Sequence, residues 1–123
     1  MGTFRHTIEI GDPQGSRYET LEALVDTGAT YSVVAAPVLR RLGVEVHNKR
    51  TFELAHGRQV ERDVGQTWMR VDGEAVITLV VFGDESAEPL LGAVTLEQLL
   101  LAVDPVRGRL IPVSGLLMQT KRT

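Results

Sequence analysis

A single carboxylate placed between two apolar runs restricts how this chain can fold more than any other feature. Asp26 directly follows a run that ends at Val25, Thr27-Gly28 comes next, and a further apolar run occupies residues 31–36. Glycine accepts tight backbone geometry at no steric cost, so this tripeptide predicts a turn between two strands. Such a turn is a rigid, partly buried mount for a carboxylate. The pattern therefore indicates an acid placed for chemistry.

Short strand-like runs, separated by turn signals, occupy most of the remaining chain. Residues 3–10 alternate apolar and polar side chains, as a half-buried strand does. His56-Gly57 and Asp72-Gly73 are typical of the tips of hairpins. The runs predicted to be strands or hairpins lie at 3–10, 17–25, 31–36, 50–83 and 103–113. The pattern predicts a mainly β protein.

Two short segments are predicted to be helical. Residues 36–44 combine Pro37, suited to the first helical position, with Gly43, suited to the position just after a helix. Residues 95–100 begin with Thr95, and a glutamine three positions later completes a variant of the capping box. One or two short helices are therefore expected beside the strands.

Length and composition limit the possible partners. The 123 residues suit one domain over 1–123, and a hydrophobic content of 43% is enough for its core. The net charge of −3 carries no basic excess, which argues against nucleic acid or a membrane as partner. Three scattered histidines and no cysteine make a metal site improbable, and no cofactor is expected. Without a signal-peptide pattern or a long apolar run, a cytoplasmic location is expected.

The other acidic residues offer no second mount like that of Asp26. None of them is followed by Thr-Gly or Ser-Gly. Aspartic proteases hydrolyse amide bonds with two carboxylates that share one proton, because like charges a few Å apart cannot both ionise. One Asp-Thr-Gly in 123 residues therefore predicts a twofold symmetric homodimer, in which the Asp26 side chains of two subunits meet at the axis.

Three segments together resemble the retropepsin-like aspartic proteases, which are the retroviral enzymes and their bacterial single-lobe relatives. The segments are LVDTGATYSVV (24–34), LAHGRQV (54–60) and EPLLGAVTLEQL (88–99). The resemblance implies an all-β, closed single-lobe fold with a flap hairpin at about 52–65. It also implies an endopeptidase that works as a homodimer, needs no cofactor and cleaves extended peptide or protein substrates.

The resemblance also assigns roles to individual residues. Asp26 would be catalytic, and Thr27 would hold the two active-site loops together across the axis. The residues implied to contact substrate are Thr27, Gly28, Ala29, Ala55, His56, Gly57, Leu90 and Leu91. Two positions depart from the retroviral pattern, because Thr30 and Ala93 stand where those enzymes carry an acid and the arginine that pairs with it.

Two other interpretations stay open at this stage. The fold can serve binding alone, so a non-catalytic dimeric peptide-binding module is possible, in line with the polar flap tip at His56 and Arg58. A chance Asp-Thr-Gly turn in an unrelated small β protein would instead predict a monomer. The apolar run 116–118 fits either a strand at the dimer interface, since retropepsin termini interleave there, or a frayed tail.

Overall fold

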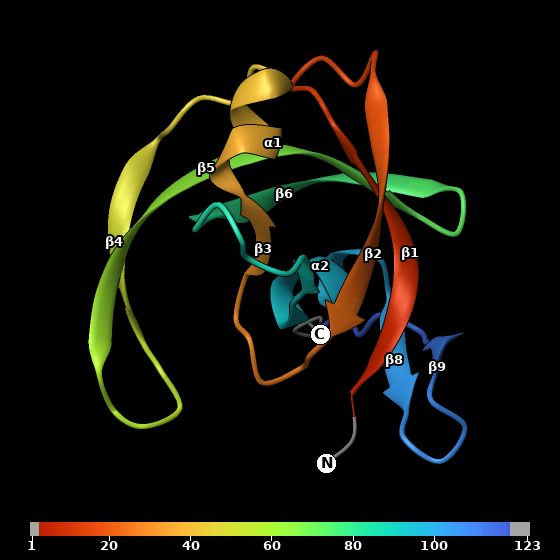
Figure 1. Ribbon diagram of the computed structural model, residues 1–123. Coiled ribbons are helices and arrows are strands. Elements are labelled where there is room, and N and C mark those ends of the chain that lie inside the picture. Colours follow the sequence, from red (N-terminus) through yellow and green to blue (C-terminus); the bar gives the residue numbers. More distant parts are fainter. Residues whose placement is uncertain (1–2, 119–123) are drawn as a thin grey trace, which may run out of the picture.

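The computed structural model describes residues 3–118 (Figure 1). Within this range the chain forms nine strands and two short helices. In chain order these are β1 (Phe4–Gly11), β2 (Tyr18–Val25), β3 (Ser32–Ala35), α1 (Ala36–Arg41), β4 (Asn48–Glu53), β5 (Gln59–Val71), β6 (Glu74–Gly83), β7 (Leu90–Leu91), α2 (Ala93–Gln98), β8 (Leu101–Asp104) and β9 (Arg109–Pro112). The strands predicted from alternation and turn chemistry are confirmed.

Seven of the strands form one sheet that closes on itself. The strand order is β1-β2-β7-β3-β6-β5-β4, and β1 also pairs with β5, where Ile10 lies opposite Met69. The sheet is thus a ring of six strands, and β4 extends from β5 as an edge strand outside the ring. This arrangement confirms the all-β, closed fold that the sequence predicted.

The interior of the ring is aliphatic. Ile10, Val34 and Met69 come from three different strands and have no exposed surface, while Leu39 of α1 and Leu96 of α2 close the core from outside the sheet. Each aliphatic side chain of this kind stabilises the fold by about 1.5–3 kcal/mol relative to an exposed one. The core therefore gives a rigid support to the loop that joins β2 to β3.

The two-residue strand β7 determines how the Asp26 region is held. It pairs in parallel with β2, where Leu24 lies opposite Leu90, and antiparallel with β3, where Val33 lies opposite the same Leu90. The loop that joins β2 to β3 therefore begins and ends beside β7, a segment distant in sequence. Hydrogen bonds to β7 hold together the two strands that flank the Asp-Thr-Gly turn.

The helices differ in their limits from the predicted ones. Helix α1 ends at Arg41, and Gly43 follows with φ +81°, in the left-handed conformation predicted for it. Helix α2 begins at Ala93 rather than at Thr95, and no side chain caps it. The predicted capping box is wrong, because the Thr95 side chain is buried and hydrogen-bonded within the core.

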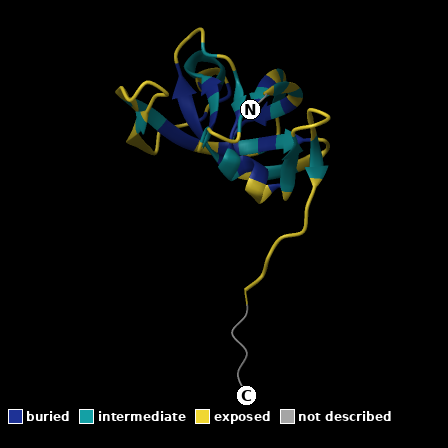
Figure 2. Cartoon of the chain, turned by 90° about the horizontal axis from the view of Figure 1, so that it is seen from below, coloured by how far each residue is buried: buried dark blue, intermediate teal, exposed yellow. Residues whose placement is uncertain are grey.

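The chain leaves the body of the molecule after β9. Strands β8 and β9 form a separate two-stranded sheet, and the following residues run outward as an exposed segment (Figure 2). Leu116, Leu117 and Met118 are 91%, 89% and 90% exposed. Their predicted place at a dimer interface stays a prediction, and the rest of the tail lies outside the described residues. No helix within residues 3–118 is long and apolar enough to cross a membrane.

Candidate active site

Asp26 is the first residue after β2, and backbone groups on both sides fix its position. Its amide donates a hydrogen bond to the Leu91 carbonyl at 3.1 Å, and its own carbonyl accepts one from the Ala29 amide at 3.1 Å. The side-chain Oδ1 accepts a hydrogen bond from the Gly28 amide at 2.9 Å. The tight Asp-Thr-Gly turn therefore orients the carboxylate through its own backbone.

The carboxylate is accessible as well as fixed. Asp26 is half-buried, and Thr27 and Gly28 are exposed. Within residues 3–118 the bond from Gly28 is the one hydrogen bond that the Asp26 side chain makes, and it occupies only Oδ1. The other carboxylate oxygen is thus available to a reactant or to a partner group.

Helix α2 holds the remainder of the loop through backbone groups. The Ala93 amide donates to the Ala29 carbonyl at 2.8 Å, and the Val94 amide donates to the Thr30 carbonyl at 3.0 Å. The first amides of a helix have no partner within the helix, so these loop carbonyls satisfy them. Retroviral enzymes pair two side chains at the positions of Thr30 and Ala93. Here the backbone of Thr30 pairs with that of Val94, and the backbone of Ala93 pairs with that of Ala29.

Gly92 allows this close approach. A Cβ atom at position 92 would lie 2.6 Å from the carbonyl carbon and oxygen of Tyr31 and 2.9 Å from the carbonyl oxygen of Ala29. Contacts this short to backbone atoms leave no room for any side chain. The Leu-Leu-Gly motif in the sequence therefore marks the point where the chain crosses directly behind residues 26–31, the candidate active-site loop between β2 and β3.

A long hairpin extends beside the loop. Strands β4 and β5 form it, and its tip spans residues 54–58, where the Leu54 amide donates to the Arg58 carbonyl at 2.7 Å and Gly57 adopts φ +88°. In Figure 1 this yellow-green hairpin tip and the orange loop after β2 lie toward the same end of the molecule. The resemblance implied a flap hairpin at about 52–65, and β4 and β5 pair as a hairpin there, from Asn48 opposite Val64 to Glu53 opposite Gln59. The role of this hairpin as a flap over substrate stays a prediction.

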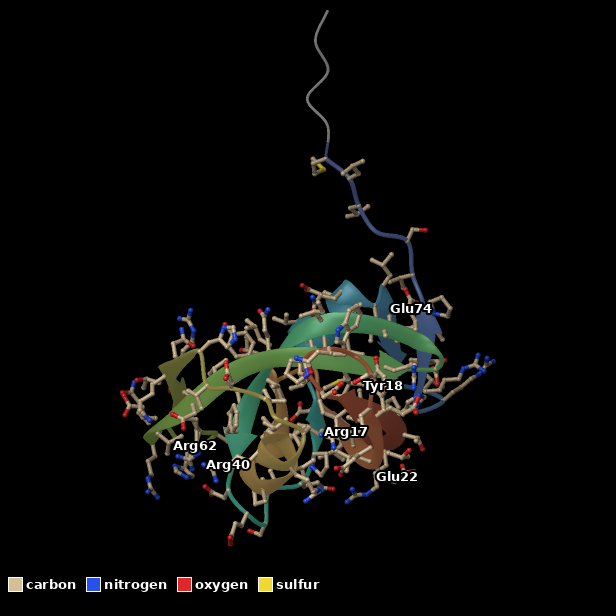
Figure 3. All side chains as sticks on the ribbon, turned by 90° about the horizontal axis from the view of Figure 1, so that it is seen from above. Arg17, Tyr18, Glu22, Arg40, Arg62 and Glu74 are labelled. Carbon is tan, nitrogen blue, oxygen red and sulfur yellow. The ribbon has the colours of Figure 1, made fainter. Side chains whose placement is uncertain are left out.

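A cleft of about 520 Å³ lies between the hairpin and the active-site loop. Tyr31 of the loop and Phe52 of the hairpin meet edge to face along it, with ring centroids 5.9 Å apart. Arg62 also lines the cleft, and its Nη2 lies 3.4 Å from a carboxylate oxygen of Asp84. Figure 3 shows Arg62 and Arg40 on the same side of the molecule. The apolar residues that line the cleft are Ala29, Val33, Phe52, Leu54, Val60, Val81 and Ala87.

The predicted substrate-contacting residues fall into three groups. Gly28 and Ala29 line the cleft, and their contact with substrate stays a prediction. Leu91 has no exposed surface, so its side chain cannot form a wall of the cleft, and that prediction is wrong. Its backbone carbonyl acts instead, as the acceptor for Asp26. Leu90 is half-buried and does not line the cleft.

The flap-tip residues lie outside the cleft of a single chain. Ala55, His56 and Gly57 are exposed, so their contact with substrate stays a prediction, as does the role of Thr27 across a dimer axis. Sequence reasoning missed Tyr31 and Phe52, although an aromatic residue immediately after Asp-Thr-Gly-Ala-Thr was the available signal. Within residues 3–118 no cluster of three or more histidine, aspartate or glutamate side chains is placed to hold a metal ion.

Residues 17–98 match the protein family described as "gag-polyprotein putative aspartyl protease". The chain belongs to this family. The matched range includes the Asp-Thr-Gly turn, the flap hairpin and the Leu-Leu-Gly crossing. Membership in this aspartyl protease family overturns the interpretation of Asp-Thr-Gly as a chance turn in an unrelated β protein.

The fold of this aspartyl protease family member is that of a retroviral enzyme. The solution structure of the Simian Foamy Virus (mac) protease matches with a TM-score of 0.56 and 23% sequence identity, over 78% of this chain and 94% of that chain. Likeness at this identity establishes the retropepsin-like fold. No curated protein sequence matches this chain.

Proposed function

We propose that this protein is an aspartic endopeptidase that acts as a symmetric homodimer, with one Asp26 from each copy in the catalytic dyad. One observation carries this function: a carboxylate fixed by the Gly28 and Leu91 backbones lies on an exposed turn, and the following residues Gly28 and Ala29 line a mainly apolar cleft of about 520 Å³. Membership in the aspartyl protease family supports peptide-bond hydrolysis as the reaction.

The reaction needs both carboxylates of the dyad. In the proposed mechanism one is ionised and accepts a proton from water as the water oxygen bonds to the peptide carbonyl carbon. The other is protonated and gives its proton to the carbonyl oxygen, which forms a tetrahedral diol. In the collapse of the diol, one diol hydroxyl returns its proton to the ionised carboxylate as the C–N bond breaks, and the protonated carboxyl gives its proton to the leaving amine. The dyad is thereby left with one shared proton, as at the start. No covalent enzyme intermediate is required.

The second carboxylate is supplied by a second copy of the chain. This chain has one Asp-Thr-Gly, and its Thr27 and Gly28 are exposed at the end of the turn. A twofold axis beside this turn would bring two identical turns into contact, as closed isologous dimers do. The Thr27 hydroxyl would then be placed to hydrogen-bond the partner's loop.

The cleft favours an extended peptide with apolar side chains. Strand β4 is an edge strand of the sheet, so its hairpin offers backbone groups to a peptide that adds as a further strand. Val33, Val81 and Phe52 line the adjoining cleft. Apolar side chains of the substrate would gain by leaving water there, at about 25 cal/mol per Å² buried.

The Asp26→Asn substitution tests the proposed function. It keeps the side-chain shape but removes the carboxylate, so the fold and the dimer should persist while cleavage of casein between pH 4 and 7 is abolished. Asp72→Asn is the matched control, because Asp72 is exposed at the β5–β6 hairpin with φ 52°, a conformation that asparagine accepts. Wild-type cleavage rates in the Asp26→Asn variant would refute the dyad.

The second candidate function is a dimeric module that binds peptides without cleaving them. The exposed and polar flap tip at His56 and Arg58 favours it. A protein that is dimeric by sedimentation and binds an apolar peptide, but cleaves nothing between pH 4 and 7, would support this alternative. Cleavage that a pepstatin-type inhibitor blocks would exclude it.

A further inference from the structure

Three buried hydroxyl groups join α2 to the neighbouring strands β3 and β6. Thr95 Oγ1 lies 2.7 Å from Ser32 Oγ and 2.8 Å from Thr78 Oγ1. Ser32 Oγ also accepts a hydrogen bond from the Gly92 amide at 3.0 Å. Ser32 and Thr95 have no exposed surface, and Thr78 is 2% exposed. The three side chains therefore form a line of hydrogen bonds, with Thr95 in the middle, inside a largely aliphatic interior.

Such a network fixes the orientation of α2 against β3 and β6 more narrowly than aliphatic packing alone does. A buried hydroxyl costs free energy unless it is hydrogen-bonded, and hydrogen bonds have narrow limits of distance and angle. Thr95 therefore has one favourable position, between Ser32 and Thr78. Because Thr95 is the third residue of α2, this position sets where the first turn of the helix lies.

The first turn of α2 in turn carries the active-site loop. The amides of Ala93 and Val94 donate to the carbonyls of Ala29 and Thr30, and the Gly92 amide is held by Ser32. A shift of α2 would move those loop carbonyls, and they lie within a few residues of Asp26. The hydroxyl network is thus connected to the carboxylate through the helix amides.

We propose that Thr95 is a positioning residue, which holds α2 and through it the Asp26 loop in the geometry that the dyad requires. Thr30 and Ala93 lack the acid and arginine side chains that would tie the loop to the helix directly, so the buried hydroxyls supply the equivalent constraint. This role rests on the proposed function, since it concerns the same carboxylate.

The Thr95→Val substitution isolates the hydroxyl, because valine has nearly the same shape. Misplacement of a catalytic group by a fraction of an ångström to an ångström lowers the rate strongly, so kcat for a peptide substrate should fall by roughly ten- to a hundredfold. KM and the dimer dissociation constant should change less than kcat, because Thr95 itself does not line the cleft and a small shift of Ala29 and Thr30 affects binding less than the alignment of the carboxylate. Thr95→Ser keeps the hydroxyl and should restore most of kcat.

Thr67→Val is the matched control. Thr67 is 1% exposed, and its hydroxyl donates to the Gly11 carbonyl at 2.6 Å. Thr67 pairs with Thr78 across β5 and β6, but its hydroxyl makes no hydrogen bond to Ser32, Thr78 or Thr95. Its loss should lower thermal stability about as much as the loss of the Thr95 hydroxyl and leave kcat unchanged at temperatures where both variants are folded. Equal losses of kcat in Thr95→Val and Thr67→Val, or no recovery in Thr95→Ser, would overturn the positioning role.

Amide hydrogen exchange separates this role from proteolysis itself. In the Asp26→Asn background, Thr95→Val should speed exchange at residues 26–31 and 92–94, and Thr67→Val should not. If wild-type protein cleaves nothing, the proposed function fails, yet faster exchange confined to these segments would still support the hydroxyl constraint on the loop. Unchanged exchange there would refute the constraint, whether or not the protein is a protease.

Discussion

The amide of Asp26 donates a hydrogen bond of 3.1 Å to the carbonyl of Leu91, a residue with no exposed surface. The proposed catalytic acid is therefore held by a backbone group that the core keeps in place. Leu91 pairs with Val25 in the parallel β2–β7 ladder, and Asp26 directly follows Val25. The sheet therefore fixes the position of the carboxylate. Substitutions that disturb this crossing should affect cleavage more than they affect folding.

Gly92→Ala should displace the active-site loop. The new Cβ would lie 2.6 Å from the Tyr31 carbonyl, and backbone atoms on both sides would have to move apart. We expect a loss of about 1–3 kcal/mol in the free energy of unfolding, as for other overpacked sites, and a disproportionate loss of kcat. Urea denaturation and peptide cleavage by the folded fraction measure the two effects.

Gly43→Ala is the control for that experiment. Gly43 adopts φ +81°, and nothing lies within 4 Å of a Cβ placed there. Alanine in the left-handed conformation costs about 1–2 kcal/mol, so this variant should also be less stable. Its folded fraction should cleave at the wild-type rate. Wild-type cleavage by Gly92→Ala would show that the close crossing does not control the loop.

The contact between Tyr31 and Phe52 should couple the active-site loop to the flap. Their rings meet at an interplanar angle of 79° with centroids 5.9 Å apart, and such edge-to-face pairs contribute about 0.5–1.5 kcal/mol beyond area burial. Tyr31→Leu and Phe52→Leu should each raise KM by roughly two- to tenfold, since 1.4 kcal/mol is a factor of ten. A double-mutant cycle on KM should show that the effects are not additive. Fully additive effects would mean that the rings act independently.

Acidification should weaken the β1–β2 turn through Asp12. Burial by itself would raise the pKa of Asp12, but hydrogen bonds from the Ser16 hydroxyl and from the Ser16 and Arg17 amides outweigh it and lower the pKa below its ordinary value. A lowered folded-state pKa adds stability above the unfolded-state pKa of about 3.9, and that stability is lost as the pH falls through the folded-state pKa.

Unfolding measurements between pH 2 and 7 check this expectation. The free energy of unfolding of the wild-type protein should decline below about pH 4, near the ordinary pKa of aspartate. Asp12→Asn should be less stable at neutral pH and should show a shallower decline, so that the two curves approach each other in acid. Parallel curves over the whole range would show that Asp12 does not cause the acid sensitivity. If cleavage has an acidic pH optimum, this loss of folding stability should set the lowest pH at which the protein is active.

The exposed apolar segment Leu116–Met118 should strengthen the proposed dimer. Three adjacent apolar side chains at about nine-tenths exposure are unfavourable in water and gain by packing against another surface. Replacing Leu116 and Leu117 with aspartate should raise the dimer dissociation constant in sedimentation experiments. The thermal stability of the protein at concentrations where it is monomeric should not change. An unchanged dissociation constant would show that this segment takes no part in the dimer interface.

The sequence by itself determined the local features of this protein. Alternation predicted β1 and β2, Asp72-Gly73 predicted the β5–β6 hairpin, and His56-Gly57 predicted the tip of the β4–β5 hairpin, because turn chemistry and side-chain period act over a few residues. Asp26 could be selected for the same reason, since the Asp-Thr-Gly turn is built from three adjacent residues and their own hydrogen bonds.

Only the tertiary structure decided how distant segments hold that turn. Thr95 was predicted to cap a helix, but its hydroxyl finds Ser32 and Thr78 in the core, and loop carbonyls take the helix amides instead. Leu91 was predicted to face substrate, but pairing with β2 buries its side chain and leaves its carbonyl for Asp26. Such outcomes depend on which segments meet in space, and the free energy of satisfying buried polar groups overrides local propensity there.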